Sequence, residues 1–135
     1  MKNAIILILV VILAVLAWTN RFYLYEPAPA KVYHEYRKKK MAARGFSNEI
    51  TESTRWSLRI KNCKVKDDIA EVLATEFTAK IPPNAASFVF ATTTKSELKA
   101  ELKLINKKWV VIKDSTLKKE VSTYEDRKNA AAKGN

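Results

Sequence analysis

The side chains that could carry acid–base, nucleophilic or metal chemistry are few in this chain. Cys63 and His34 are the single members of their types, whereas a structural zinc site uses four such ligands. His34 lies in a lysine-rich segment, and Cys63 lies among alternating apolar residues. A reactive cysteine needs a base beside it, so we interpret Cys63 as a core residue and His34 as a surface aromatic. Glycine occurs only at positions 45 and 134, which excludes the glycine-rich loops that bind phosphate.

Acidic residues occur in pairs, but none of these pairs has the pattern of a catalytic site. The dipeptide Asp67–Asp68 is typical of a turn. Glu71 and Glu76 fall on opposite faces if their segment is a strand. Glu97 and Glu101 would share a face, but lysines lie between them in the sequence, as on a solvated strand. We therefore predict a protein that is not an enzyme and that carries no cofactor and no metal.

The chain is strongly basic, and nearly all of its charge follows an apolar N-terminus. Its 135 residues include 25 Lys and Arg against 14 Asp and Glu, a formal net charge of +11. Such an excess favours anionic partners. The densest basic run comprises Arg37, Lys38, Lys39 and Lys40. This run is either a solvated helix face or a contact site for anionic lipid headgroups or another anionic polymer. Residues 32–40 come closest to the mixture of basic and aromatic residues that nucleic acid needs. Nucleic acid is not favoured, because anionic lipid or a cell-wall polymer explains the same residues with fewer assumptions.

The apolar segment from Ala4 to Trp18 has two interpretations. As a helix its 15 residues would be about 22 Å long, shorter than a hydrocarbon core of about 30 Å. That length is typical of a signal peptide, and small residues before Trp18 would allow cleavage after Ala17. If the helix continues to Tyr25, its 22 residues span about 33 Å and cross the bilayer. We favour an uncleaved transmembrane signal anchor over residues 1–25.

An aromatic cluster after the apolar segment supports the anchor. The predicted membrane-interface residues are Trp18, Arg21, Phe22, Tyr23 and Tyr25. Amphipathic rings concentrate at membrane boundaries, and an arginine there can extend toward the headgroups. Once the run at 37–40 is set aside, two positive charges lie on each side of the apolar segment, so the positive-inside rule favours neither orientation. The short positive start before the apolar segment then favours a single-pass protein with an extracytoplasmic C-terminal domain.

The rest of the chain predicts a proline-rich spacer at 26–31, a small domain at 32–114 and a charged flexible tail at 115–135. Pro29 suits the first turn of a helix that ends at Gly45 with a left-handed cap. Apolar alternation from Trp56 predicts a strand with a bulge at Asn62.

Two further segments, 69–81 and 96–105, fit either a helix or a strand. Turn residues beside each of them favour hairpins, so we predict strands. Residues 86–94 are β-branched and aromatic and predict another strand. A final strand is predicted at 109–112, where Trp109 and Trp56 are interpreted as core residues.

The motifs "KDDIAEVLA" at 66–74 and "KKWVVI" at 107–112, following an N-terminal helix, resemble the nuclear transport factor 2-like superfamily of cystatin-like, cone-shaped α+β domains. The resemblance covers roughly residues 31–114 and implies a bent sheet that curls around helices. It implies scaffolding or binding more often than catalysis. The expected fold is therefore α+β, with a transmembrane helix followed by a short helix on a curved antiparallel sheet of about four strands.

Together these features predict a non-catalytic, single-pass membrane protein whose basic domain is a binding or scaffolding module in a cell-envelope complex. Its predicted partners are membrane lipids and other proteins of that complex. Two alternatives stay open. One is a small-ligand-binding or enzymatic cone, and the other is a cytoplasm-facing electrostatic adaptor that binds anionic lipid.

Overall fold

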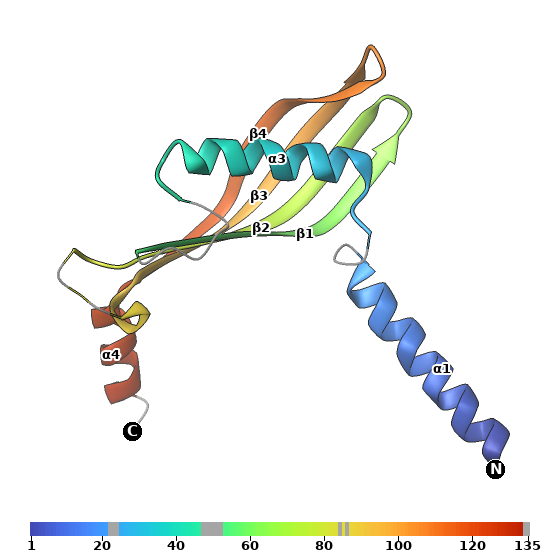
Figure 1. Cartoon of the computed structure of the whole chain (residues 1–135), viewed down its shortest axis with the longest axis horizontal. Helices are drawn as coiled ribbons and strands as arrows, with labels where there is room; N and C mark the ends of the chain where they lie inside the picture. The colour runs from blue at the N-terminus through green and yellow to red at the C-terminus, as the bar shows by residue number, and fades with distance from the viewer. Residues whose placement is uncertain (22–24, 47–52, 84, 86, 134–135) are drawn as a thin grey trace.

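In the part of the chain that the structure describes, one α-helix covers a sheet and two further α-helices extend from it. The computed structural model describes residues 1–21, 25–46, 53–83, 85 and 87–133. The elements are α1 (Lys2–Thr19), α3 (Ala28–Ala42), β1 (Thr54–Lys66), β2 (Ile69–Lys80), the 3-10 helix η1 (Phe88–Phe90), β3 (Thr92–Ile105), β4 (Lys108–Ser122) and α4 (Tyr124–Lys133). The strands form a curved antiparallel sheet in the order β1-β2-β3-β4, with α3 on one face (Figure 1). The predicted α+β class is confirmed.

Tight turns at two hairpins fix the register of the sheet. Asp67 and Asp68 connect β1 to β2, and Asp67 has a φ of 56°. Asn106 and Lys107 connect β3 to β4 with φ values of 49° and 65°. Left-handed conformation at Asp67 and at both Asn106 and Lys107 is typical of the two-residue turns whose twist matches that of paired strands. The two segments that fit helix or strand equally well are therefore strands, as predicted.

β1 contains one extra residue opposite β2. Ile60 pairs with Ala74 and Asn62 pairs with Leu73, so Lys61 is the additional residue. A bulge of this kind moves the residues that follow it to the other face, and Cys63 returns to the side of the core. The bulge predicted at Asn62 is confirmed.

α3 begins and ends with the signals that the sequence indicated. Pro29 lies in the first turn, where its missing N–H leaves no helix bond unmade. The N–H of Gly45 donates to the Ala42 carbonyl and that of Phe46 to the Met41 carbonyl, both at 3.0 Å. Gly45 has a φ of 87°, which completes a left-handed cap of the Schellman type. The chain therefore leaves α3 at the predicted glycine.

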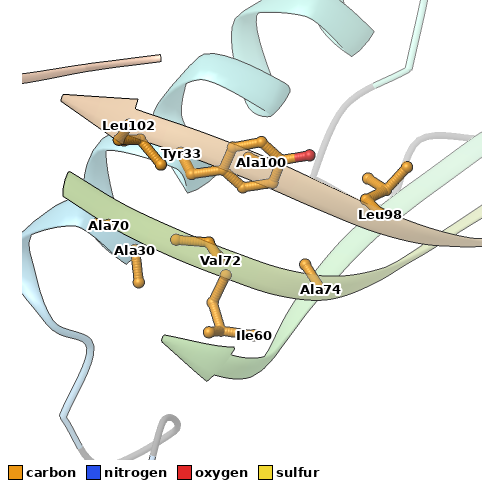
Figure 2. Packing of buried hydrophobic residues seen from close by; sticks show 9 residues of the cluster. All are labelled: Ala30, Tyr33, Ile60, Ala70, Val72, Ala74, Leu98, Ala100 and Leu102. Carbon is orange, nitrogen blue, oxygen red and sulfur yellow. The ribbon is translucent and has the colours of Figure 1, made fainter. Parts of the chain in front are cut away.

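The main core lies between α3 and the sheet. Its nine buried residues are Ala30 and Tyr33 from α3, Ile60 from β1, Ala70, Val72 and Ala74 from β2, and Leu98, Ala100 and Leu102 from β3 (Figure 2). The ring of Tyr33 is fully buried, and alanines on β2 and β3 leave room for it. Trp56 is buried as predicted, whereas Trp109 is half-buried at the margin of the core.

The C-terminal part of the chain differs from the prediction. The domain does not end at residue 114, because β4 stays paired with β3 as far as Ser122. Residues 115–122 lack apolar alternation because much of this edge strand is exposed, so its side chains carried no signal. α4 then begins at a reciprocal cap, in which Thr123 and Asp126 each accept a hydrogen bond from the other's backbone N–H.

The strand predicted at 86–94 begins only at Thr92. Phe88–Phe90 form η1 instead. The guanidinium of Arg127 on α4 donates to the carbonyls of Val89 at 2.9 Å and Ala91 at 2.6 Å. These tertiary contacts hold a short helical turn in residues whose intrinsic preference is for a strand.

Candidate functional site

A buried arginine joins α3 to the sheet. Arg37 donates from Nε to Glu76 Oε2 at 2.8 Å and from Nη2 to Glu76 Oε1 at 2.5 Å. Its Nη1 donates to Asp114 Oδ2 at 2.9 Å. Glu76 lies on β2 and Asp114 on β4, so a single guanidinium connects the helix to two strands that are not neighbours.

Tyr33 and Trp56 complete this group, and we call these five residues the buried ion cluster. The Tyr33 hydroxyl donates to Asp114 Oδ1 at 2.6 Å, and Trp56 Nε1 donates to Glu76 Oε2 at 3.2 Å. Every carboxylate oxygen of the cluster therefore has a donor. Arg37 is 6% exposed and Glu76 is 4% exposed. Charges this deep in a protein are stable only when they are paired and hydrogen-bonded.

The protonation of the buried ion cluster is fixed by its surroundings. Burial raises the pKa of the Tyr33 hydroxyl far above its ordinary value, and the hydrogen bond to Asp114 raises it further. Burial alone would lower the pKa of Arg37, but the hydrogen bonds and charges of Glu76 and Asp114 raise it overall. Both groups keep their protons at neutral pH. The cluster therefore positions α3 and is not poised to transfer protons.

Tyr33→Phe is expected to lower the free energy of unfolding by about 1.5–3 kcal/mol at neutral pH, because a buried carboxylate loses its donor. Above about pH 10 the wild-type chain loses about 1.4 kcal/mol per pH unit through this group, since the unfolded tyrosine ionises while the folded one keeps its proton. The variant lacks that loss, so the two stabilities should converge as the pH rises. Urea unfolding of the detergent-solubilised chain between neutral pH and about pH 11 measures both.

Tyr25→Phe is the matched control for this substitution, because Tyr25 is 71% exposed. It should leave stability unchanged at neutral pH. A constant difference between wild type and Tyr33→Phe at every pH would contradict a raised pKa at Tyr33.

The other candidate chemical groups lie apart from one another. Over the ranges that the structure describes, no group of three or more His, Cys, Asp or Glu side chains could hold a metal ion. Cys63 is half-buried, and burial raises the pKa of its thiol. His34 is partly exposed, with Nδ1 3.0 Å from Glu26 Oε1 and its ring edge-on to Trp56. Neither residue has the surroundings of a nucleophile and its base.

The predicted basic run divides between two sides of α3. Arg37 does not face an anionic partner, because its donors are occupied in the buried ion cluster. Lys38 is half-buried, whereas Lys39 and Lys40 are exposed. Lys40 Nζ lies 3.5 Å from Asp114 Oδ2. Contact with anionic groups stays a prediction for these three lysines only.

Sequence reasoning missed the buried ion cluster, although one signal for it was present. The buried residues of α3 include Ala30, Tyr33, Arg37 and Met41, which are spaced three, four and four residues apart. This spacing describes one helix face, and an arginine at its centre must find partners in the protein. Nothing in the sequence of β2 or β4 indicated which acids those partners are.

α1 is one helix that is long and apolar enough to cross a membrane. Its 18 residues span about 27 Å, and all of them are exposed. α1 ends at Thr19, and the predicted continuation to Tyr25 runs through residues 22–24, which lie outside the described residues. The Thr19 hydroxyl donates to the Val15 carbonyl and Asn20 Nδ2 donates to the Leu16 carbonyl, so these side chains satisfy the last turn.

The predicted membrane-interface residues are only partly described. The guanidinium carbon of Arg21 lies 4.4 Å from the centre of the Trp18 ring, a favourable cation–π arrangement. Tyr25 is exposed, and Lys31 Nζ lies 5.9 Å from its ring. Phe22 and Tyr23 lie outside the described residues. A membrane boundary at this point stays a prediction.

Two of the hollows formed by the described residues lie on opposite sides of the sheet. A hollow of about 540 Å³ lies between Thr19–Arg21, at and just after the end of α1, and the sheet face opposite α3, next to Ser57 and Phe77. A second hollow of about 480 Å³ runs between α3 and β4, with Tyr36 and Val110 among its lining residues. We call the sheet face opposite α3 the open face and the second hollow the α3–β4 groove. Apolar side chains dominate the lining of the groove.

The chain matches no protein-family model, no curated protein and no solved structure. Its function is therefore inferred from the geometry of the domain and of α1. The geometry offers a buried ion cluster that positions a helix, two open surfaces and an exposed apolar helix.

Proposed function

We propose that this chain is a single-pass membrane protein whose small basic α+β domain is a non-catalytic binding or scaffolding module in a cell-envelope complex. The observation that carries this proposal is α1, an apolar helix with no residue buried against the rest of the described chain. An apolar surface of that size is stable in a hydrocarbon core and not in water. A domain that follows such a helix is held at the membrane surface.

The buried ion cluster supports a binding role over a catalytic one. The carboxylates, guanidinium and hydroxyl of this cluster lie between α3 and the sheet, where they form hydrogen bonds with one another. A catalytic group must reach its substrate, whereas these groups do not reach solvent. Their effect is to hold α3 rigidly, which keeps the α3–β4 groove in one shape for a partner.

The finer parts of the proposal concern fold family and compartment. A helix laid across a curved four-stranded antiparallel sheet is compatible with a reduced nuclear transport factor 2-like cone. The short positive start before α1 favours an extracytoplasmic domain. A C-terminal reporter that is active only outside the cytoplasm determines the compartment.

The anchor and the binding role are tested in turn. If α1 is the anchor, the protein stays in the membrane pellet after alkaline carbonate extraction and its intact mass includes residues 1–17. A mature mass that begins at Trp18 would contradict the anchor. Purification in mild detergent should then recover partner subunits in a fixed ratio.

The substitution Tyr36→Glu should release those subunits, because it places a charge in the apolar α3–β4 groove, where the Tyr36 side chain is exposed. Val89→Glu is the matched control, since Val89 is also exposed but lies on η1. A protein that purifies alone, or equal loss of partners in both variants, would contradict a partner in the groove.

A further inference from the structure

We propose that the open face of the sheet rests on the anionic headgroups of the bilayer in which α1 is anchored. The inference rests on the proposed anchor and names the surface beside it. The open face and not the basic run of α3 is then the lipid contact.

The geometry places this face toward the membrane. α3 covers one side of the sheet, and α1 leaves from the other side (Figure 1). The end of α1 and the open face line one hollow, with Arg21 on one side and Phe77 on the other. Residues 20–27 separate α1 from α3, so the connection spans at most about 30 Å even when fully extended. The domain cannot move far from the bilayer surface.

The charge of the open face is complementary to anionic lipid. Strand register places paired residues on the same face, so Lys64, Glu71, Glu101 and Lys113 form one row across it. The basic residues that the register places on this face are Arg55, Arg59, Lys61, Lys64, Lys66, Lys95, Lys99, Lys103, Lys108, Lys113 and Lys118. Its acidic residues are Glu71, Glu97, Glu101 and Glu120. Eleven positive charges against four attract an anionic surface within a screening length of about 8–10 Å.

Apolar side chains among these lysines favour a headgroup layer over water. Phe77 and Ile69 lie on the open face and are 41% and 51% exposed. Lysine stems and aromatic rings pack together at membrane interfaces while the charged ends reach phosphate. A second copy of the chain is the less favourable occupant, because two identical faces would bring an excess of positive charge together on both sides.

Lipid nanodiscs that contain the full chain test this inference. A fluorophore is attached at Ser57→Cys on the open face in a Cys63→Ser background, and a headgroup spin label in the lipid quenches it by proximity. Quenching should be about twofold stronger in an equal mixture of phosphatidylglycerol and phosphatidylcholine than in phosphatidylcholine alone. At about 1 M salt, where the screening length is about 3 Å, quenching in the mixed lipid should fall to the level measured in phosphatidylcholine alone.

Charge reversal supplies the matched comparison. A triple substitution to glutamate should abolish the dependence of quenching on anionic lipid. It changes Lys61, Lys95 and Lys113, which are all exposed on the open face. The same reversal at Lys31, Lys39 and Lys119, on the side of α3, should preserve it. A reference fluorophore at Lys39→Cys should show no lipid dependence in the unreversed chain.

Three results would overturn the inference. Equal quenching in neutral and anionic lipid would show that the open face does not rest on headgroups. Energy transfer between Ser57 labels on two chains in one disc would identify a second copy as the occupant. Failure of the chain to enter the disc at all would overturn the anchor and the inference together, whereas the first two results leave the anchor intact.

Discussion

Replacement of Arg37 by methionine is expected to lower the free energy of unfolding by about 3–5 kcal/mol. The substitution keeps an unbranched apolar stem but leaves Glu76 and Asp114 as buried carboxylates without their cation. An uncompensated buried charge is far less stable than a buried ion pair. Urea unfolding of the detergent-solubilised full chain, followed by tryptophan fluorescence, measures the change.

Lys39→Met is the matched control, because Lys39 lies two residues away on the exposed side of α3. It should change stability by no more than about 0.5 kcal/mol. Adding Glu76→Gln and Asp114→Asn to Arg37→Met should restore part of the loss, since no buried charge then remains. If Arg37→Met and Lys39→Met have equal effects, the buried ion cluster does not hold α3 on the sheet.

The strands of this domain were predictable because their signals are local. Asp67 and Asn106 adopt the left-handed conformation that aspartate and asparagine tolerate in turns, and each turn fixes two strands at once. The apolar alternation from Trp56 continues through the bulge at Lys61. Gly45 ends α3 where only a residue without a side chain is unstrained. Each of these features depends on a few neighbouring residues.

The site was less predictable because its contacts are distant in sequence. Arg37 and Asp114 are 77 residues apart, and nothing near either one indicates the pairing. The sequence treats the basic run at 37–40 as one feature, either a solvated helix face or an anionic contact site, yet the helical period turns its first member, Arg37, into the core. The end of β4 was missed for the opposite reason. An exposed edge strand needs backbone pairing but no apolar pattern.

β2 shows why burial could not be assigned from residue size. Leu73 and Phe77 are large apolar residues on one face of the strand, and Ala70 and Ala74 are small residues on the other. α3 covers the face with the alanines, because the Tyr33 ring fills the space above them. The larger residues are left on the open face, where the proposed contact is lipid.

Leu98→Ala is expected to lower the free energy of unfolding by about 2–5 kcal/mol. Leu98 is 2% exposed and lies in the core with Ile60 and Ala74. Truncation removes buried methyl groups and leaves a cavity that the rigid position of α3 prevents from closing.

The matched control is Leu73→Ala, the same chemical change at a half-buried position on the open face. That variant should lose about 1 kcal/mol or less, because the site opens to solvent and no cavity forms. Both are measured by urea unfolding in detergent, and equal losses would mean that α3 does not define the buried face of the sheet.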